Sequence, residues 1–295
     1  MPQEKPIKSS SIHFISNQTY DNQNDISKQL YKLTGYFSDD FIHPVKKIGR
    51  ILEIWSDESI FGDQFCVSLV VNCNTKEVIV NANAQLHQLA DSYNLPYFHF
   101  TELLGNRKFF KDAKQKQTFI NQFIQVLKPL KLSIYVLAQE KSITNKNYDR
   151  EELSKEDIFH NLFWGSFREL MNDLQSDDII LIHKEQGNNY SDDYTRQIHK
   201  SLCMGINCML SVCFDKYISI CKYPQEFSKR NFIKSAVSDF VAYSICKLQE
   251  KISKGVPIHK INKNYYMILQ IYSECFQIRL LPSLTLTQLL SSKAL

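Results

Sequence analysis

The stretch Ile51-Leu52-Glu53-Ile54-Trp55-Ser56-Asp57-Glu58-Ser59 decides the fold. Its apolar first part predicts a β-strand over 51–56, and a second strand, 64–72, follows a short turn at Gly62. Two adjacent carboxylates, Asp57 and Glu58, would then lie between strands that pair in the middle of a sheet, which is electrostatically costly. A polar turn accounts for them, since Asp and Ser favour turns. An aspartate of a divalent-metal site is the other explanation.

The chain has 295 residues, which suits one large domain with extensions or two small domains. Its hydrophobic content of 43% is that of a globular protein with a real core. The net charge of +4 permits a nucleic-acid partner without indicating one.

Cysteine usage points to an intracellular protein. None of the eight cysteines forms a Cys-x-x-Cys pair or a zinc-type cluster, and most lie in apolar runs, where free thiols behave as small hydrophobes. We find no signal-peptide pattern and no apolar run of about eighteen residues. We therefore expect a soluble, cytoplasmic protein with no membrane partner.

Composition divides the chain into three parts. Residues 1–47 form a polar extension that is either partly flexible or docked on the main domain. Residues 48–252 alternate strand-like and helix-like segments, and residues 253–295 look like a helical C-terminal extension. Strands are expected at 51–56, 64–72, 76–81, 132–137, 178–183 and 207–214. Helices are expected at 85–93, 114–127, 157–174, 192–204 and 232–252. This order predicts an α/β fold with a mixed sheet flanked by helices.

Two further acids are candidates for a site. Glu102 follows the apolar run that ends at Phe100, where it is either a helix-start carboxylate near a Thr cap or a site residue. Asp239 lies on the apolar face of the last helix among small residues. An aspartate there is costly to bury unpaired, so a cation, a basic group or solvent should compensate it.

The strand that ends in His183-Lys184-Glu185 offers two more candidates. His183 and Glu185 are two residues apart and would share one face of the strand, where either is able to bind a metal. An ordinary strand end explains them as well.

A basic stretch follows Glu102 directly. Arg107, Lys108 and Lys111 are interleaved with aromatic residues, which suits phosphate contact and base stacking, although a solvated loop has the same composition. The sequence contains no glycine-rich phosphate loop, no Gly-x-Ser-x-Gly and no His-Glu-x-x-His.

In order, three motifs resemble those of the ribonuclease-H-like proteins catalogued as domain of unknown function 3800. They are Asp57-Glu58-Ser59, His99-Phe100-Thr101-Glu102-Leu103 and Ser238-Asp239-Phe240-Val241-Ala242. The resemblance spans about residues 50 to 250. It implies a ribonuclease-H-like mixed β-sheet flanked by helices, with acids from separate elements meeting at one end of the sheet.

The resemblance also implies a metal-dependent phosphodiesterase or nuclease. Asp57, Glu102 and Asp239 would bind Mg²⁺ or Mn²⁺, with Glu58 as an auxiliary. Where the family has an aspartate at the end of the later strand, this chain has His183-Lys184. Glu185 is the substitute within reach of the same site.

Two other functions fit the same residues. In the first, the protein is a catalytically inactive binding or regulatory module in which Lys184 takes the place of the metal. In the second, it is an acid–base enzyme acting on a small phosphorylated substrate.

Overall fold

The computed structural model describes residues 23–105, 109–140, 155–185, 203–206, 208, 216–223, 225–227, 231–257, 260–261 and 278–281. Its strands are β1 (Ile51–Phe61), β2 (Gln64–Asn72), β3 (Leu132–Glu140), β4 (Ile179–Glu185), β5 (Ser219–Ile220), β6 (Gln225–Phe227) and β7 (Ile278–Leu281). Its helices are α1 (Gln23–Thr34), the 3-10 helix η1 (Ser38–Asp40), α2 (Lys76–Ser92), α3 (Phe100–Gly105), α4 (Ala113–Leu127), α6 (Lys155–Met171) and α8 (Phe232–Ser253).

The strands form one mixed sheet, and the fold is α/β as expected. Its central order is β3-β2-β1-β4-β5, with β7 outside β3 and β6 paired to β4. Strand β2 is antiparallel to both β1 and β3, whereas β4 is parallel to β1. This order is consistent with the ribonuclease-H-like topology that the motifs imply.

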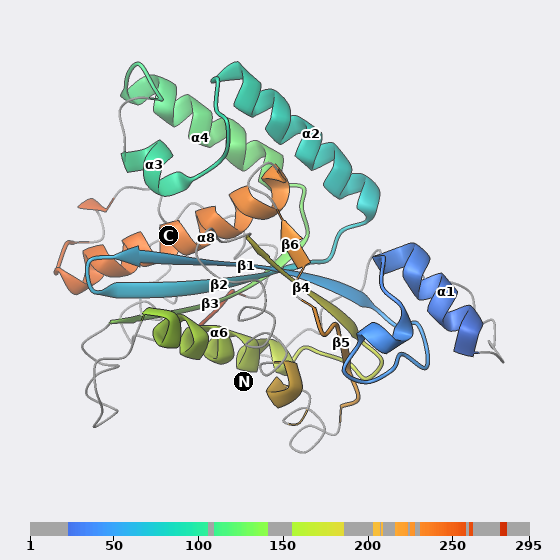
Figure 1. Cartoon of the computed structure of the whole chain (residues 1–295). Coiled ribbons are helices and arrows are strands. Elements are labelled where there is room, and N and C mark those ends of the chain that lie inside the picture. The colour runs from blue at the N-terminus through green and yellow to red at the C-terminus, as the bar shows by residue number, and fades with distance from the viewer. Residues whose placement is uncertain are drawn as a thin grey trace, which may run out of the picture.

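Helices cover both faces of the sheet (Figure 1). Helix α8 packs along β1 and β2, with α2, α3 and α4 beyond it, on the face to which Trp55 and Val70 belong. We call this the α8 face. Helix α6 covers the opposite face, to which Ile54 and Leu69 belong, and we call this the α6 face. No helix in the described part of the chain is long and apolar enough to cross a membrane.

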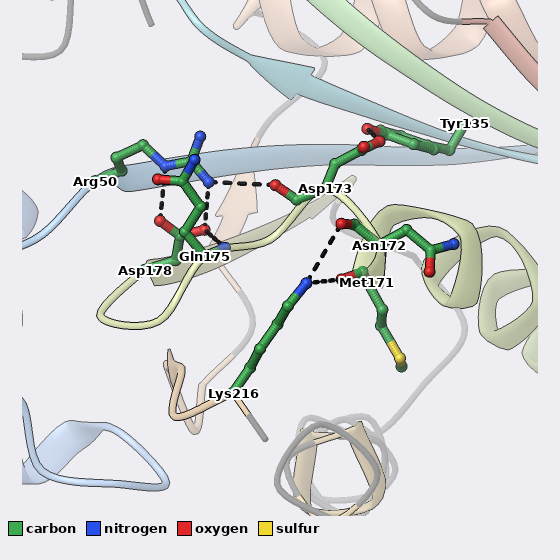
Figure 2. A network of polar contacts seen from close by, with 8 residues as sticks. All are labelled: Arg50, Tyr135, Met171, Asn172, Asp173, Gln175, Asp178 and Lys216. Carbon is green, nitrogen blue, oxygen red and sulfur yellow. Dashed lines mark hydrogen bonds and ion pairs between the residues drawn. The ribbon is translucent and has the colours of Figure 1, made fainter. Parts of the chain in front are cut away.

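An ion pair joins the starts of β1 and β4 (Figure 2). Arg50 donates from Nε and Nη2 to the two carboxylate oxygens of Asp178, at 2.7 and 2.6 Å. The backbone N–H of Gln175 donates to the same carboxylate, and Ile179 N donates to Arg50 O. The first residue pair of the two strands, Ile51 and Ile179, follows immediately. The ion pair therefore lies where the register of β1 against β4 begins.

The described part of the N-terminal extension docks on the main domain. Ile26 and Leu30 of α1, together with Phe41 and Val45, pack against Leu181 of β4 in a small separate core. Of the two alternatives for residues 1–47, docking is confirmed for 23–47, and residues 1–22 lie outside the described residues.

The strand expected at 76–81 is wrong, because these residues begin helix α2. The Thr75 hydroxyl accepts a hydrogen bond from Val78 N and caps the helix. Leu86 and Leu89 then bury one helical face, while Val78 and Val80 stay exposed. Local β-propensity was overridden by the cap and by the 3.6-residue period.

The polar turn offered as one explanation of Asp57 and Glu58 is wrong, whereas the turn expected at Gly62 is confirmed. Strand β1 runs on to Phe61, and Asp57 pairs with Ser68 in the middle of the β1–β2 ladder. The helices expected at 114–127 and 232–252 and the strand at 132–137 are confirmed. Residues 278–281, expected to be helical, form β7 beside β3. Most of 192–204 and 207–214 lies outside the described residues.

Candidate functional site

Asp57 lies in β1 on the α8 face and is half-buried. Its neighbour Ser68 donates a hydrogen bond from its hydroxyl to Ser238 O of α8 at 3.1 Å, and the same hydroxyl lies 3.4 Å from Asp57 O. The small side chain of Ser68 thus allows α8 to lie close to the sheet. This contact between Ser68 and Ser238 places Asp57 beside the turn of α8 that carries Asp239.

Asp239 is buried on α8 and joins that helix to α3. Its Oδ2 accepts a hydrogen bond from Phe100 N, the first residue of α3, at 2.6 Å. A hydrogen bond to a charged carboxylate is short and strong, and it offsets the cost of burying the charge. The sequence required a compensating group for Asp239, and the backbone at the start of α3 supplies one.

Glu102 lies in the first turn of α3, two residues after the N–H that Asp239 holds. Tyr97 donates from its hydroxyl to Glu102 Oε2 at 2.8 Å, and His99 Nδ1 lies 3.1 Å from Oε1. Helix α3 packs on α8, so Glu102 belongs to the same part of the molecule as Asp239. Glu102 is thus also a helix-start carboxylate, although Thr101 lies within α3 and is not its cap.

The parallel pairing of β1 and β4 brings the end of β4 next to Asp57. The last two pairs are Trp55 with His183 and Ser56 with Lys184. The next residues along the two strands are Asp57 and Glu185, and both strands continue through them. The backbone of Glu185 is therefore level with Asp57. The side chain of Glu185 is outside the described part.

Two of the expected residues lie on the other side of the sheet. Glu58 alternates with Asp57 and is exposed on the α6 face. The ammonium group of Lys184 lies over the ring of Phe163 of α6, 5.8 Å from its centroid. Neither side chain is brought to the acids on the α8 face, and Lys184 is not placed to stand in for a metal there.

A lysine that the sequence did not single out lies on the α8 face instead. Lys234 of α8 has its Nζ 3.0 Å from His183 Nδ1 and 3.6 Å from Glu53 Oε2. Glu53 is also 3.8 Å from His183 Nε2 and accepts a hydrogen bond from Trp55 Nε1 at 3.4 Å. The sequence clue was the interruption of two apolar patterns, by Glu53 in β1 and by Lys234 in α8.

Burial determines the charge of His183. Burial lowers the pKa of His183 to about 4, the nearby Lys234 ammonium lowers this pKa further, and Glu53 raises it. His183 is therefore neutral at pH 7. Lys234 Nζ is 3.0 Å from Nδ1 and 3.5 Å from Nε2. Because an ammonium group can only donate, the nearer Nδ1 is assigned as its acceptor and the ring proton is assigned to Nε2, 3.8 Å from Glu53.

The basic stretch is described only in part. Arg107 and Lys108 lie outside the described residues, and Lys111 is exposed just before α4. Lys116, from the same stretch, donates to Leu104 O near the end of α3. One lysine of α4 thus contacts the helix that carries Glu102.

Among the described side chains, no three His, Cys, Asp or Glu are grouped so as to hold a metal ion. That set does not include the side chain of Glu185. Carboxylate oxygens are the donors that Mg²⁺ and Mn²⁺ prefer. Asp57, Glu102 and Asp239 all have described side chains, so the three acids expected to bind the ion are not grouped in this way. Asp57 and Glu185, which are level on adjacent strands, are of the residue types that such an ion prefers.

Sequence comparisons do not extend these observations. No protein-family model matches the chain, and no curated protein matches it.

Proposed function

We propose that this protein is a divalent-metal-dependent phosphodiesterase, acting as a nuclease, with a ribonuclease-H-like fold and a kinship to domain of unknown function 3800. The observation that carries the proposal is the level placement of Asp57 and Glu185 on adjacent parallel strands. The Ser68–Ser238 hydrogen bond holds the turn of α8 that carries Asp239 against β2, beside Asp57. The strand order and directions support the fold.

In this proposal Asp57 and Glu185 hold Mg²⁺ or Mn²⁺, with Asp239 and Glu102 beside them. A bound divalent ion supplies an activated water and stabilises the leaving oxygen of a phosphodiester. Asp239 also fixes the start of α3 through Phe100 N, and so fixes where Glu102 lies. Glu58 has no part in the site, because it is on the α6 face.

The substrate in this proposal is a nucleic-acid strand. The basic stretch Arg107, Lys108 and Lys111 follows directly after the helix that carries Glu102, and positive charge beside an acidic centre attracts a phosphate backbone. Neighbouring phenylalanines in the stretch suit base stacking.

The test is cleavage of labelled DNA and RNA, single- and double-stranded, with Mg²⁺ or Mn²⁺. Asp57→Asn, Glu185→Gln and Asp239→Asn should each lower the rate by about 100-fold or more, because a charged ligand contributes several kcal/mol to the transition state. Asp63→Asn is the matched control, since Asp63 is exposed at the far end of the β1–β2 hairpin. No metal-dependent cleavage by the wild-type protein, or equal rates in all variants, would exclude the nuclease.

A second candidate is the inactive binding module. The observation that favours it is the Lys234 ammonium group, which lies against His183 where the family pattern has an acid. Lys184 has no such place, because its ammonium group lies over the ring of Phe163 on the α6 face. Calorimetry separates the two functions, since the module predicts no Asp57-dependent binding of Mn²⁺.

A further inference from the structure

Three nitrogen donors surround the carboxylate of Glu53. They are the Lys234 ammonium at 3.6 Å, His183 Nε2 at 3.8 Å and Trp55 Nε1 at 3.4 Å. They come from α8, β4 and β1, so the fold itself brings them together. Each distance is longer than the 2.7–3.2 Å of a well-formed N–H···O bond. Glu53 therefore satisfies none of the three donors with a well-formed hydrogen bond.

The donors are buried and the acid is not. The side chains of His183 and Lys234 are 9% and 14% exposed, whereas that of Glu53 is 32% exposed. A buried ammonium group requires an anion, because its loss of hydration is otherwise uncompensated. Glu53 supplies that anion from the solvent side, and this is the side from which a ligand would enter.

We propose that Lys234, His183 and Trp55 form a binding site for a phosphate group of a nucleic-acid strand, and that Glu53 occupies this site when no strand is bound. A phosphate has more acceptor oxygens than a carboxylate, so it satisfies three donors from three different elements better than Glu53 does. The identity of the ligand as a nucleic acid rests on the proposed function, but the anion site itself does not.

The site is close enough to the acids to act on the same strand. Glu53 precedes Asp57 by four residues on the same face of β1, a distance of about 13 Å. Lys234 likewise precedes Ser238 by about one helical turn of α8. A strand held at Lys234 reaches Asp57 with a few nucleotides, which places Lys234 as a substrate-binding residue outside the acidic centre.

The test measures binding in EDTA, so that cleavage plays no part. Fluorescence anisotropy of a labelled single-stranded 12-mer, DNA and RNA, is recorded from 50 to 300 mM salt. Lys234→Gln should weaken binding about tenfold and reduce the slope of log K against log salt by about 0.7, the value for one lost phosphate contact on a single strand. Glu53→Gln should tighten binding several-fold, because it removes the competing charge. Inorganic phosphate should compete in the wild-type protein and much less in Lys234→Gln.

Two variants serve as controls. Lys184→Gln makes the same charge change on the α6 face and should leave the affinity and slope as they are in the wild type. Lys234→Arg keeps the cation and should retain binding, which separates loss of the site from loss of the fold. Thermal unfolding of each variant is recorded alongside.

The inference is overturned if the wild type does not bind the strand, if Lys234→Gln keeps the wild-type slope, or if Glu53→Gln fails to tighten binding. Lys234-dependent binding without cleavage after Mg²⁺ or Mn²⁺ is added would remove the nuclease and leave this site in place. Metal-dependent cleavage with binding that is independent of Lys234 would support the nuclease and remove the proposed phosphate site.

Discussion

Arg50 donates two hydrogen bonds to Asp178, one residue before β1 and β4 begin to pair. Asp57 follows Arg50 by seven residues, and Glu185 follows Asp178 by seven. The register that the Arg50–Asp178 ion pair fixes at the start of the two strands is therefore the one that places Asp57 level with Glu185 at their end. A slip of one residue would move one acid of the pair to the other face of the sheet.

Removing Asp178 should destabilise the protein strongly. Asp178→Ala leaves the Arg50 guanidinium, which is 13% exposed, without its carboxylate, and breaking such a buried pair costs about 3–5 kcal/mol. Urea unfolding measures the loss. Lys47→Ala is the control, because the Lys47–Asp177 pair is exposed and should contribute less than about 1 kcal/mol. A loss below that value for Asp178→Ala would show that the pair does not hold the register.

Gly49 should tolerate no side chain. A Cβ at this position would lie 2.2 Å from Asp177 O, so Gly49→Ala forces the chain entering β1 away from the turn before β4. We expect a loss of about 1–3 kcal/mol in the free energy of unfolding. Gly105→Ala, with no atom within 4 Å of its Cβ, should be neutral or slightly stabilising. Equal effects of the two changes would refute the close approach.

Asp239 should act on stability as well as on activity. Asp239→Ala leaves Phe100 N–H without its acceptor and should cost about 1–3 kcal/mol, whereas Asp239→Asn keeps an acceptor oxygen and should cost less. Thermal unfolding compares the two. If both unfold alike, the hydrogen bond to α3 contributes nothing, and Glu102 is positioned by other contacts.

Stability should fall in mild acid because of His183. Its pKa is about 4 in the folded protein against 6.5 when unfolded, so the unfolded chain binds more protons between these values. The contribution is complete above pH 6.5, falls as the pH drops toward 4, and amounts to at most about 3 kcal/mol. Urea unfolding in EDTA, wild type against His183→Gln, isolates it from the carboxylates. Parallel pH profiles for the two proteins would contradict the burial of a neutral ring between Lys234 and Glu53.

Regular periodicity made some elements predictable. The apolar positions of α4 and α8 repeat with the helical period over many residues, and the β-branched run of β3 reads as a strand. Helix α2 was missed because Val78-Ile79-Val80 has local β-propensity, and only the cap at Thr75 and the later leucines make it helical. Length and packing outweighed the local preference.

The sequence identified the acids of the candidate site but not the residues that they and their neighbours contact. Asp239 stood out because an aspartate on an apolar helix face needs a partner, yet the sequence does not say that the partner is Phe100 N. Lys234 was missed because its contacts, His183 and Glu53, lie on strands far away in the chain. Contacts of this kind depend on strand register and helix placement, which no local pattern contains.

The long sequence separations between the elements around Asp57 also determine when these elements come together. The β1–β2 hairpin that carries Asp57 is made of local contacts, whereas its register with β4 joins residues 128 apart and Ser68 meets Ser238 across 170 residues. Contacts between distant residues form late, because closing long loops is entropically costly. During synthesis Asp57 is therefore an ordinary hairpin residue until α8 has been made, and its contacts with β4 and α8 form among the last events of folding.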